Sequence, residues 1–183
     1  MKVYVDTGTL INYLAQAAPG ASILRSAKRR GRTTAQLFED AREVLNRVAT
    51  AHQGATSALT FYEIEEALYK QLVASTKGMP HARSARVVAA RPIVAQALIA
   101  ARLFGLEILE IGERTVDSLA GHTGLVANAV RAADGLHIVR AIDFDADLML
   151  ATDRGLLALD GILRNQRGVP MRCCDANIAL TLL

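Results

Sequence analysis

The stretch KVYVDTGTLINYL, residues 2–14, decides the fold class. Its first four residues, KVYV, are mostly β-branched or aromatic and predict a short buried strand. Asp6 ends this strand, and TLINYLAQ then predicts a helix that stops near Pro19 and Gly20. An apolar strand that passes almost directly into a helix is typical of a parallel sheet covered by helices.

Four more strands are predicted farther along the chain, and helical sequence separates them. They are ATSAL from residue 55, GLEILEI from 105, ADLMLAT from 146 and VPMRCC from 169. Strands that alternate with helices predict an α/β fold with a parallel sheet of about five strands and helices on both faces. Since no repeat, low-complexity segment or linker interrupts this pattern, residues 1–183 are expected to form a single domain.

The helices between these strands have recognisable start signals. Thr33 and Thr34 are candidate caps for AQLFEDAREVLNRVATAHQ, and Thr60 for FYEIEEALYKQLVAS. A long Ala-rich helix is expected to end near Phe104. LVANAVRAADGLHIVRAID, residues 125–143, predicts one long helix, and RGLLALDGIL, residues 154–163, predicts another.

Composition places few limits on function. Apolar residues make up 51% of the chain and aromatic residues only 4%, so the core must consist largely of Ala, Leu, Val and Ile. The net charge of +3 permits binding to nucleic acid without demanding it. Five of the 21 basic residues lie in RSAKRRGR, residues 25–32, with no acid among them, and this stretch is either a solvated loop or helix end, or a patch that contacts phosphates.

The remaining sequence features bear on the cellular compartment in which the protein is expected. The adjacent Cys173 and Cys174 predict buried, reduced thiols, because neighbouring cysteines form at best a strained disulfide. Residues 3–14 are too short for a signal peptide, and Asp6 interrupts them. No apolar run is expected to cross a membrane, so a soluble, cytoplasmic protein is expected.

Two acids directly follow predicted strands. Asp6 follows the first strand and Asp153 the fourth, and ligands of open α/β sheets gather beyond the carboxyl ends of strands. The two carboxylates are therefore expected to converge. Each residue alone is equally explained as the N-cap of the following helix.

Two further acids lie within predicted helices. Glu63 fits a capping box with Thr60, which is a structural alternative to catalysis. Asp134 shares a helix face with apolar residues, where an unpaired carboxylate costs several kcal/mol. It therefore requires a cation, a donor or water. Arg131 is one candidate partner, and His137 is either another or a satisfied interior histidine.

These four acids and their surroundings resemble the PIN-domain family, in particular the VapC-like toxins of bacterial toxin–antitoxin pairs. The matching segments are VYVDTGTLINYL, SALTFYEIEEAL, RAADGLHIVRAI and ADLMLATDRGL, in the family's order over nearly the whole chain. The long regions between Asp6 and Glu63 and between Glu63 and Asp134 depart from the family pattern.

The resemblance implies an α/β/α sandwich and a ribonuclease that uses Mg²⁺ or Mn²⁺, which prefer oxygen ligands. The implied catalytic residues are Asp6, Glu63, Asp134 and Asp153, with Asp6, Asp134 and Asp153 as metal ligands. Thr7 and Thr152 are expected to support these acids. Arg29, Arg30 and Arg154 are the expected contacts to the RNA backbone, where charge provides affinity without sequence information.

The family also suggests a cognate antitoxin and a homodimer. Alternatives that remain open are an RNA-processing nuclease without an antitoxin and a PIN-like protein that binds RNA or a partner without cleaving. An actin-like ATPase is disfavoured because a second Gly-rich phosphate turn is missing. A haloacid-dehalogenase phosphatase is disfavoured because Gly8 occupies the position of its second acid.

Overall fold

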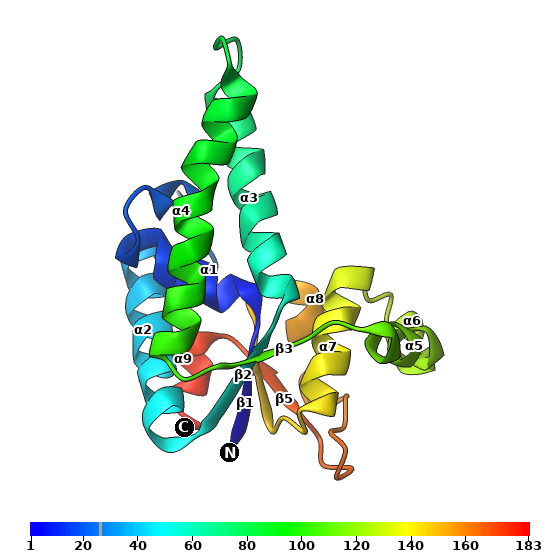
Figure 1. Cartoon of the computed structure of the whole chain (residues 1–183). Coiled ribbons are helices and arrows are strands. Elements are labelled where there is room, and N and C mark those ends of the chain that lie inside the picture. Colours follow the sequence, from blue (N-terminus) through cyan, green and yellow to red (C-terminus); the bar gives the residue numbers. More distant parts are fainter. Residues whose placement is uncertain (26) are drawn as a thin grey trace.

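The computed structural model describes residues 1–25 and 27–183, and within them the strands form one five-stranded parallel sheet (Figure 1). Ser26, in the predicted basic stretch, lies outside the described residues. The strands are Lys2–Val5 (β1), Gln53–Ser57 (β2), Glu107–Leu109 (β3), Leu148–Leu150 (β4) and Arg172–Cys174 (β5). Their order is β3-β2-β1-β4-β5, so the first strand is central. The predicted α/β class and parallel sheet are confirmed.

Helices connect the strands and cover both faces of the sheet (Figure 1). They are Thr7–Ala17 (α1), Thr34–Ala51 (α2), Leu59–Ser75 (α3), Ala82–Leu103 (α4), Glu113–Gly121 (α5), Thr123–Ala127 (α6), Ala132–Asp143 (α7), Arg154–Leu157 (α8) and Ala176–Ala179 (α9), with a 3₁₀ turn at Ala21–Leu24 (η1).

The alternation of side chains along the strands creates two hydrophobic cores. Val3 and Val5 of β1 pack on one face of the sheet, against α1, α2, α3, α4 and α9. Tyr4, between them, points to the opposite face, where Ile138 of α7 and Leu156 of α8 lie. Because helices cover both faces, β4 is apolar throughout and β1 is apolar after Lys2, whereas β2 carries the buried polar residues Thr56 and Ser57.

The parallel register brings the carboxyl ends of the strands together at one edge of the sheet. Tyr4 pairs with Ala55 of β2 on one side and with Met149 of β4 on the other. The amide of Asp6 continues the ladder by donating to the Leu150 carbonyl at 3.0 Å. The residues that follow β1, β2 and β4 therefore meet at this edge.

Several predicted helix boundaries are confirmed and three are wrong. Thr33 caps α2 in a capping box with Gln36. Helix α3, however, begins at Leu59 without a side-chain cap, so the predicted Thr60–Glu63 capping box does not form. The predicted helix over 125–143 is two helices, α6 and α7, because Ala129 adopts a φ of 53° between them. The predicted helix over 154–163 is only the four-residue α8.

Helices α3 and α4 form a hairpin that projects beyond the sheet (Figure 1). Helix α4 is long and apolar enough to cross a membrane by length and composition alone, which corrects the expectation that no segment is. Arg83, Arg86, Arg91 and Arg102 lie on this helix, and Pro92 is inside it. Its Ala90, Ile93 and Ala97 are buried in the core.

Candidate functional site

Asp6 lies at the centre of the carboxyl edge, directly after β1. Its side chain is buried, with 6% of the residue exposed. Oδ2 accepts a hydrogen bond from the Gly8 amide at 3.3 Å, so Asp6 is the N-cap of α1. Oδ1 lies 3.7 Å from Nε2 of His137 instead. One carboxylate oxygen of Asp6 thus caps α1 while the other faces the site. The expected roles of Asp6 as an N-cap and as a site residue are therefore compatible.

Glu63 reaches the same place from the first turns of α3. Its Oε2 accepts hydrogen bonds from the Thr7 hydroxyl and, at 2.9 Å, from Nε2 of His137. Thr60, its predicted capping partner, instead lies 2.9 Å from the hydroxyl of Thr56. Among the described contacts, Oε1 of Glu63 has no protein partner, so this oxygen remains available to a ligand or to water.

His137 is the buried base of the site. Its ring is fully buried, and Nδ1 lies 2.8 Å from the Tyr4 hydroxyl. The Ser57 hydroxyl lies 3.4 Å from the same nitrogen. His137 is therefore a satisfied interior histidine, as one of the two alternatives expected, but its partner is Glu63 and not Asp134. One ligand atom each from Asp6, Glu63 and His137 lie within 4.8 Å of one another.

The charges of this group are coupled. Burial opposes protonation of His137, but its hydrogen bond to Glu63 and the charges of Asp6 and Glu63 raise its pKa. Burial likewise opposes ionisation of Glu63, but His137 outweighs it and lowers the pKa of Glu63. Burial raises the pKa of Asp6, and the nearby Glu63 charge adds to this rise. A protonated His137 thus offsets part of the negative charge.

Asp134 and Asp153 complete the acidic cluster from the other side. Both line a cavity of about 310 Å³, together with Arg131 and Arg154. Asp134 is in the first turn of α7, where the helix dipole favours a negative charge. Asp153 caps α8 through Oδ1, which accepts from the Gly155 amide at 2.7 Å.

The negative charges of the other three acids affect the pKa of Asp134. Burial raises its pKa, and the charges of Asp153, Asp6 and Glu63 raise it further. Within the described residues, no basic side chain lies within 4.0 Å of its carboxylate, so the expected alternative of an ion pair with Arg131 does not occur. The residue is half-buried and open to the cavity. The four predicted acids therefore lie in one region of negative charge.

The two threonines predicted to support the acids contribute differently. Thr7 donates its hydroxyl to Glu63 and so holds that carboxylate in place. Thr152 is buried against Gly8, where an added Cβ would lie 1.9 Å from the Thr152 Oγ1. The contact of Thr152 to the basic stretch is made by its carbonyl oxygen, which accepts from Nη2 of Arg29 at 2.6 Å.

Of the three arginines predicted to contact RNA, two lie beside the acids and the third is paired elsewhere. Arg29 lies beside the site through its bond to Thr152, and Arg154 lines the cavity of Asp134 and Asp153. Arg30 instead forms an ion pair with Asp175, at 3.4 Å.

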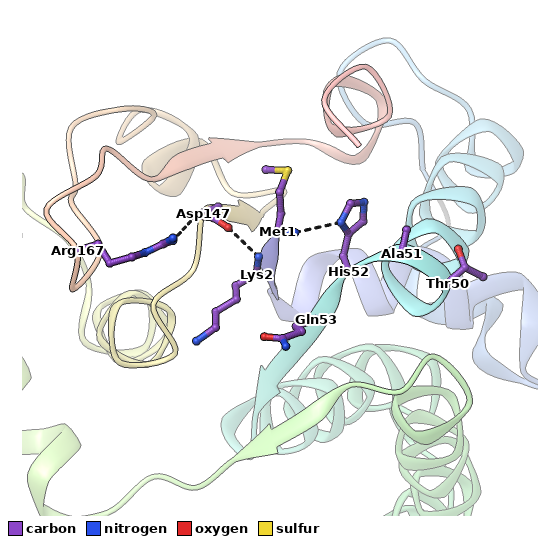
Figure 2. Close-up of a pocket in the computed structure, with 8 residues that line it drawn as sticks. All are labelled: Met1, Lys2, Thr50, Ala51, His52, Gln53, Asp147 and Arg167. Atoms are coloured by element: carbon purple, nitrogen blue, oxygen red, sulfur yellow. Dashed lines mark hydrogen bonds and ion pairs between the residues drawn. The ribbon is translucent and has the colours of Figure 1, made fainter.

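A larger cavity than that of Asp134 and Asp153 lies at the opposite edge of the sheet. It measures about 630 Å³ and lies where β1 and β2 begin (Figure 2). There the Met1 amino group lies 3.3 Å from Nδ1 of His52, and the Lys2 amide donates to Asp147 at 2.8 Å. Open α/β sheets bind ligands at the carboxyl ends of strands, so the acidic edge is the stronger candidate despite its smaller cavity.

Two further residues, Tyr4 and Ser57, complete the hydrogen bonding of His137, and neither was predicted from the sequence to have a functional role. The sequence signal for Tyr4 was its hydroxyl, because a buried tyrosine in a largely apolar strand needs a hydrogen-bond partner. Comparisons of the chain with protein-family models, with curated proteins and with solved structures find no match. The site must therefore be interpreted from its own chemistry.

Proposed function

We propose that this protein is a Mg²⁺- or Mn²⁺-dependent endoribonuclease of the PIN type. One observation carries the proposal: Asp6, Glu63, Asp134 and Asp153 come from four distant segments, yet their charges act on one another at the carboxyl edge of the sheet. Folding draws like charges together at a cost. A bound divalent cation would offset that cost, and it prefers oxygen ligands of the kind that these residues supply.

The residues fit such a cation. Asp6, Asp134 and Asp153 would hold it, since the caps occupy only one oxygen of Asp6 and one of Asp153. When bound, the metal activates water and stabilises negative charge on the phosphate under attack. Glu63 is kept ionised by His137 and Thr7, and its Oε1 would accept a proton from the attacking water.

The neighbouring arginines suit a phosphate-rich substrate. Arg154 and Arg29 flank the acids and would contact the RNA backbone, whereas the charge of Arg30 is offset by its ion pair with Asp175. Products with a 5′-phosphate and a 3′-hydroxyl are expected by analogy with PIN nucleases.

The direct test is RNA cleavage with and without Mg²⁺ or Mn²⁺. Asp6→Asn and Asp153→Asn should each reduce the cleavage rate at least ~100-fold, because each removes a ligand charge while preserving an oxygen for the helix cap. Asp117→Asn, an exposed acid on α5, is the matched control and should cleave normally. Wild-type cleavage by either site variant would refute the ligand assignment.

The biological role that we propose is that of a toxin neutralised by a cognate antitoxin, with the toxin acting as a homodimer. Expression should then arrest growth, and Asp6→Asn should relieve the arrest. A wild-type chain that cleaves RNA without arresting growth would point to an RNA-processing nuclease. A chain that binds RNA but never cleaves it, with no response to Mg²⁺ or Mn²⁺, would be a non-catalytic binding protein.

A further inference from the structure

Three basic side chains face one small cavity beside the acidic site. Arg25, Lys28 and Arg29 line a space of about 250 Å³, and Gln71 of α3 closes it. Gln71 is about two helical turns beyond Glu63 on the same helix. The other lining residues, Leu24 and Ala27, are apolar, so no carboxylate of the described residues lines this cavity.

The basic stretch contains two other arginines, and these are neutralised. Nη1 of Arg30 lies 3.4 Å from the Asp175 carboxylate. Nη2 of Arg32 lies 2.5 Å from the Asp40 carboxylate. Arg30 and Arg32 thus anchor the loop to α9 and α2 and contribute little net charge.

The two arginines that face the cavity differ from Arg30 and Arg32, because their hydrogen-bond partners are neutral. Nε of Arg25 donates to the amide oxygen of Asn12 at 2.9 Å, and Arg29 donates to the carbonyl of Thr152. Within the described residues, neither these arginines nor Lys28 have a carboxylate within 4.0 Å. The uncompensated positive charge of the loop is therefore concentrated around this cavity.

Crowding of these charges is unfavourable without an anion. Burial lowers the pKa of Arg25 and the charge of Arg29 lowers it further, and the Asp175 carboxylate offsets only part of this decrease. Two guanidinium groups and an ammonium group around one cavity supply many N–H donors, and the Gln71 amide adds neutral ones. Arginine and lysine donors arranged in this way suit a phosphate group in both charge and hydrogen-bonding geometry.

We propose that this cavity binds a phosphate group of the RNA strand, separate from the phosphate that is cleaved. This inference rests on the proposed function and deepens it. Arg29 connects the cavity to Thr152, which immediately precedes Asp153. A strand held here and at the acids at the same time is anchored at two phosphates, so the cavity adds a second backbone contact beside the cleaved bond.

The first test uses inorganic phosphate and does not depend on cleavage. Phosphate should raise the Tm of the full chain relative to chloride at equal ionic strength. The double variant Lys28→Gln/Arg29→Gln should lose this increase, and Lys28→Gln alone should weaken it without disturbing the bond to Thr152. Arg42→Gln/Lys70→Gln is the matched control, because both residues are exposed and ion-paired on α2 and α3.

The second test measures binding of a short single-stranded RNA as a function of salt, in the Asp6→Asn background. The slope of log K against log salt should fall by about 0.7 in the double variant, because the protein then neutralises one phosphate fewer. The control pair should leave the slope unchanged. Equal decreases with 5′-phosphorylated and 5′-hydroxyl RNA identify an internal phosphate, and a decrease confined to the former identifies the terminal one; both support a phosphate pocket.

The two proposals can fail separately. If the wild type never cleaves RNA, the proposed function fails, while the phosphate measurement still tests the cavity. If the wild type cleaves RNA but the double variant keeps both the phosphate response and the salt slope, the phosphate pocket is refuted. Loss of the phosphate response with an unchanged RNA slope would refute its role in holding the strand.

Discussion

Gly8 shows how closely the backbone of the site is packed. It follows Asp6 by two residues, and its amide donates to that carboxylate. A Cβ added there would lie 1.9 Å from Oγ1 and 3.0 Å from Cβ of Thr152. The absence of a side chain at residue 8 thus allows α1 to approach the end of β4, and Asp6 to approach Asp153.

Gly8→Ala should therefore destabilise the protein by about 1–3 kcal/mol, as expected for an overpacked core. Urea unfolding would measure the change. Gly121→Ala is the control, since nothing lies within 4 Å of the added Cβ, and it should be nearly neutral. Adding Thr152→Ala to Gly8→Ala should recover part of the loss, whereas no recovery would show that the clash lies elsewhere.

Individual residues differed in how far the sequence could predict them. Asp6 and Asp153 were predictable because an acid directly after a buried strand must lie at the carboxyl edge. The partners of Glu63 were not, because capping by Thr60 is a local pattern, whereas the bonds from Thr7 and His137 depend on tertiary contacts. From the sequence, His137 was either a partner of Asp134 or a satisfied interior histidine, and its contact with Glu63 was not predicted.

At the level of elements, Asp160 connects the turn after α8 to the edge strand β5. Its carboxylate accepts from Nε of Arg172 at 2.8 Å and from the Cys173 amide at 2.8 Å. The hydrogen bond from Arg172 is the main cause that lowers the pKa of Asp160 in the folded protein. A lowered folded pKa means that this carboxylate stabilises the fold above its unfolded pKa of about 3.9.

The stabilisation from Asp160 should disappear as the pH falls through its folded pKa. Asp160→Asn should therefore be less stable than the wild type at neutral pH, and the difference in unfolding free energy should shrink on acidification. Chemical unfolding at several pH values would measure it, with Asp117→Asn as the reference substitution. A difference that stays constant down to acidic pH would mean that the carboxylate charge is not responsible.

The errors in predicting elements have a common physical origin. Periodicity correctly predicted the five strands and most helices, because covered parallel strands are apolar runs. It merged α6 and α7 because residues 125–143 contain no Gly near Ala129 and no Pro, although Ala129 adopts a left-handed conformation there. That break places Asp134 in a first helical turn beside a cavity, and not on a fully buried face.

The whole molecule has two parts with different packing. The sheet and its helices contain the two cores, whereas the far half of the α3–α4 hairpin has no buried residue anywhere between residues 69 and 89, all of them described. There the helices are connected by a hydrogen bond at 2.8 Å from Arg86 to Thr76, and Arg86 lies over the ring of Tyr69. Val88, 71% exposed, and Met79, 56% exposed, face solvent.

Amides between residues 69 and 89 should accordingly exchange with deuterium faster than those of residues 90–101, because local opening there exposes little apolar surface. Hydrogen–deuterium exchange followed by mass spectrometry on the isolated chain would measure this. Strong protection of the hairpin tip that disappears on dilution would instead indicate that a second copy covers it.

The central position of β1 has a consequence for protein synthesis. Asp6 is synthesised before Asp134 and Asp153, and its cluster is completed only when they join it. The flanking strand β4, which fixes the far side of the site, also emerges late. A nascent chain therefore holds no complete acidic cluster until both Asp134 and Asp153 have been synthesised and β4 has paired with β1.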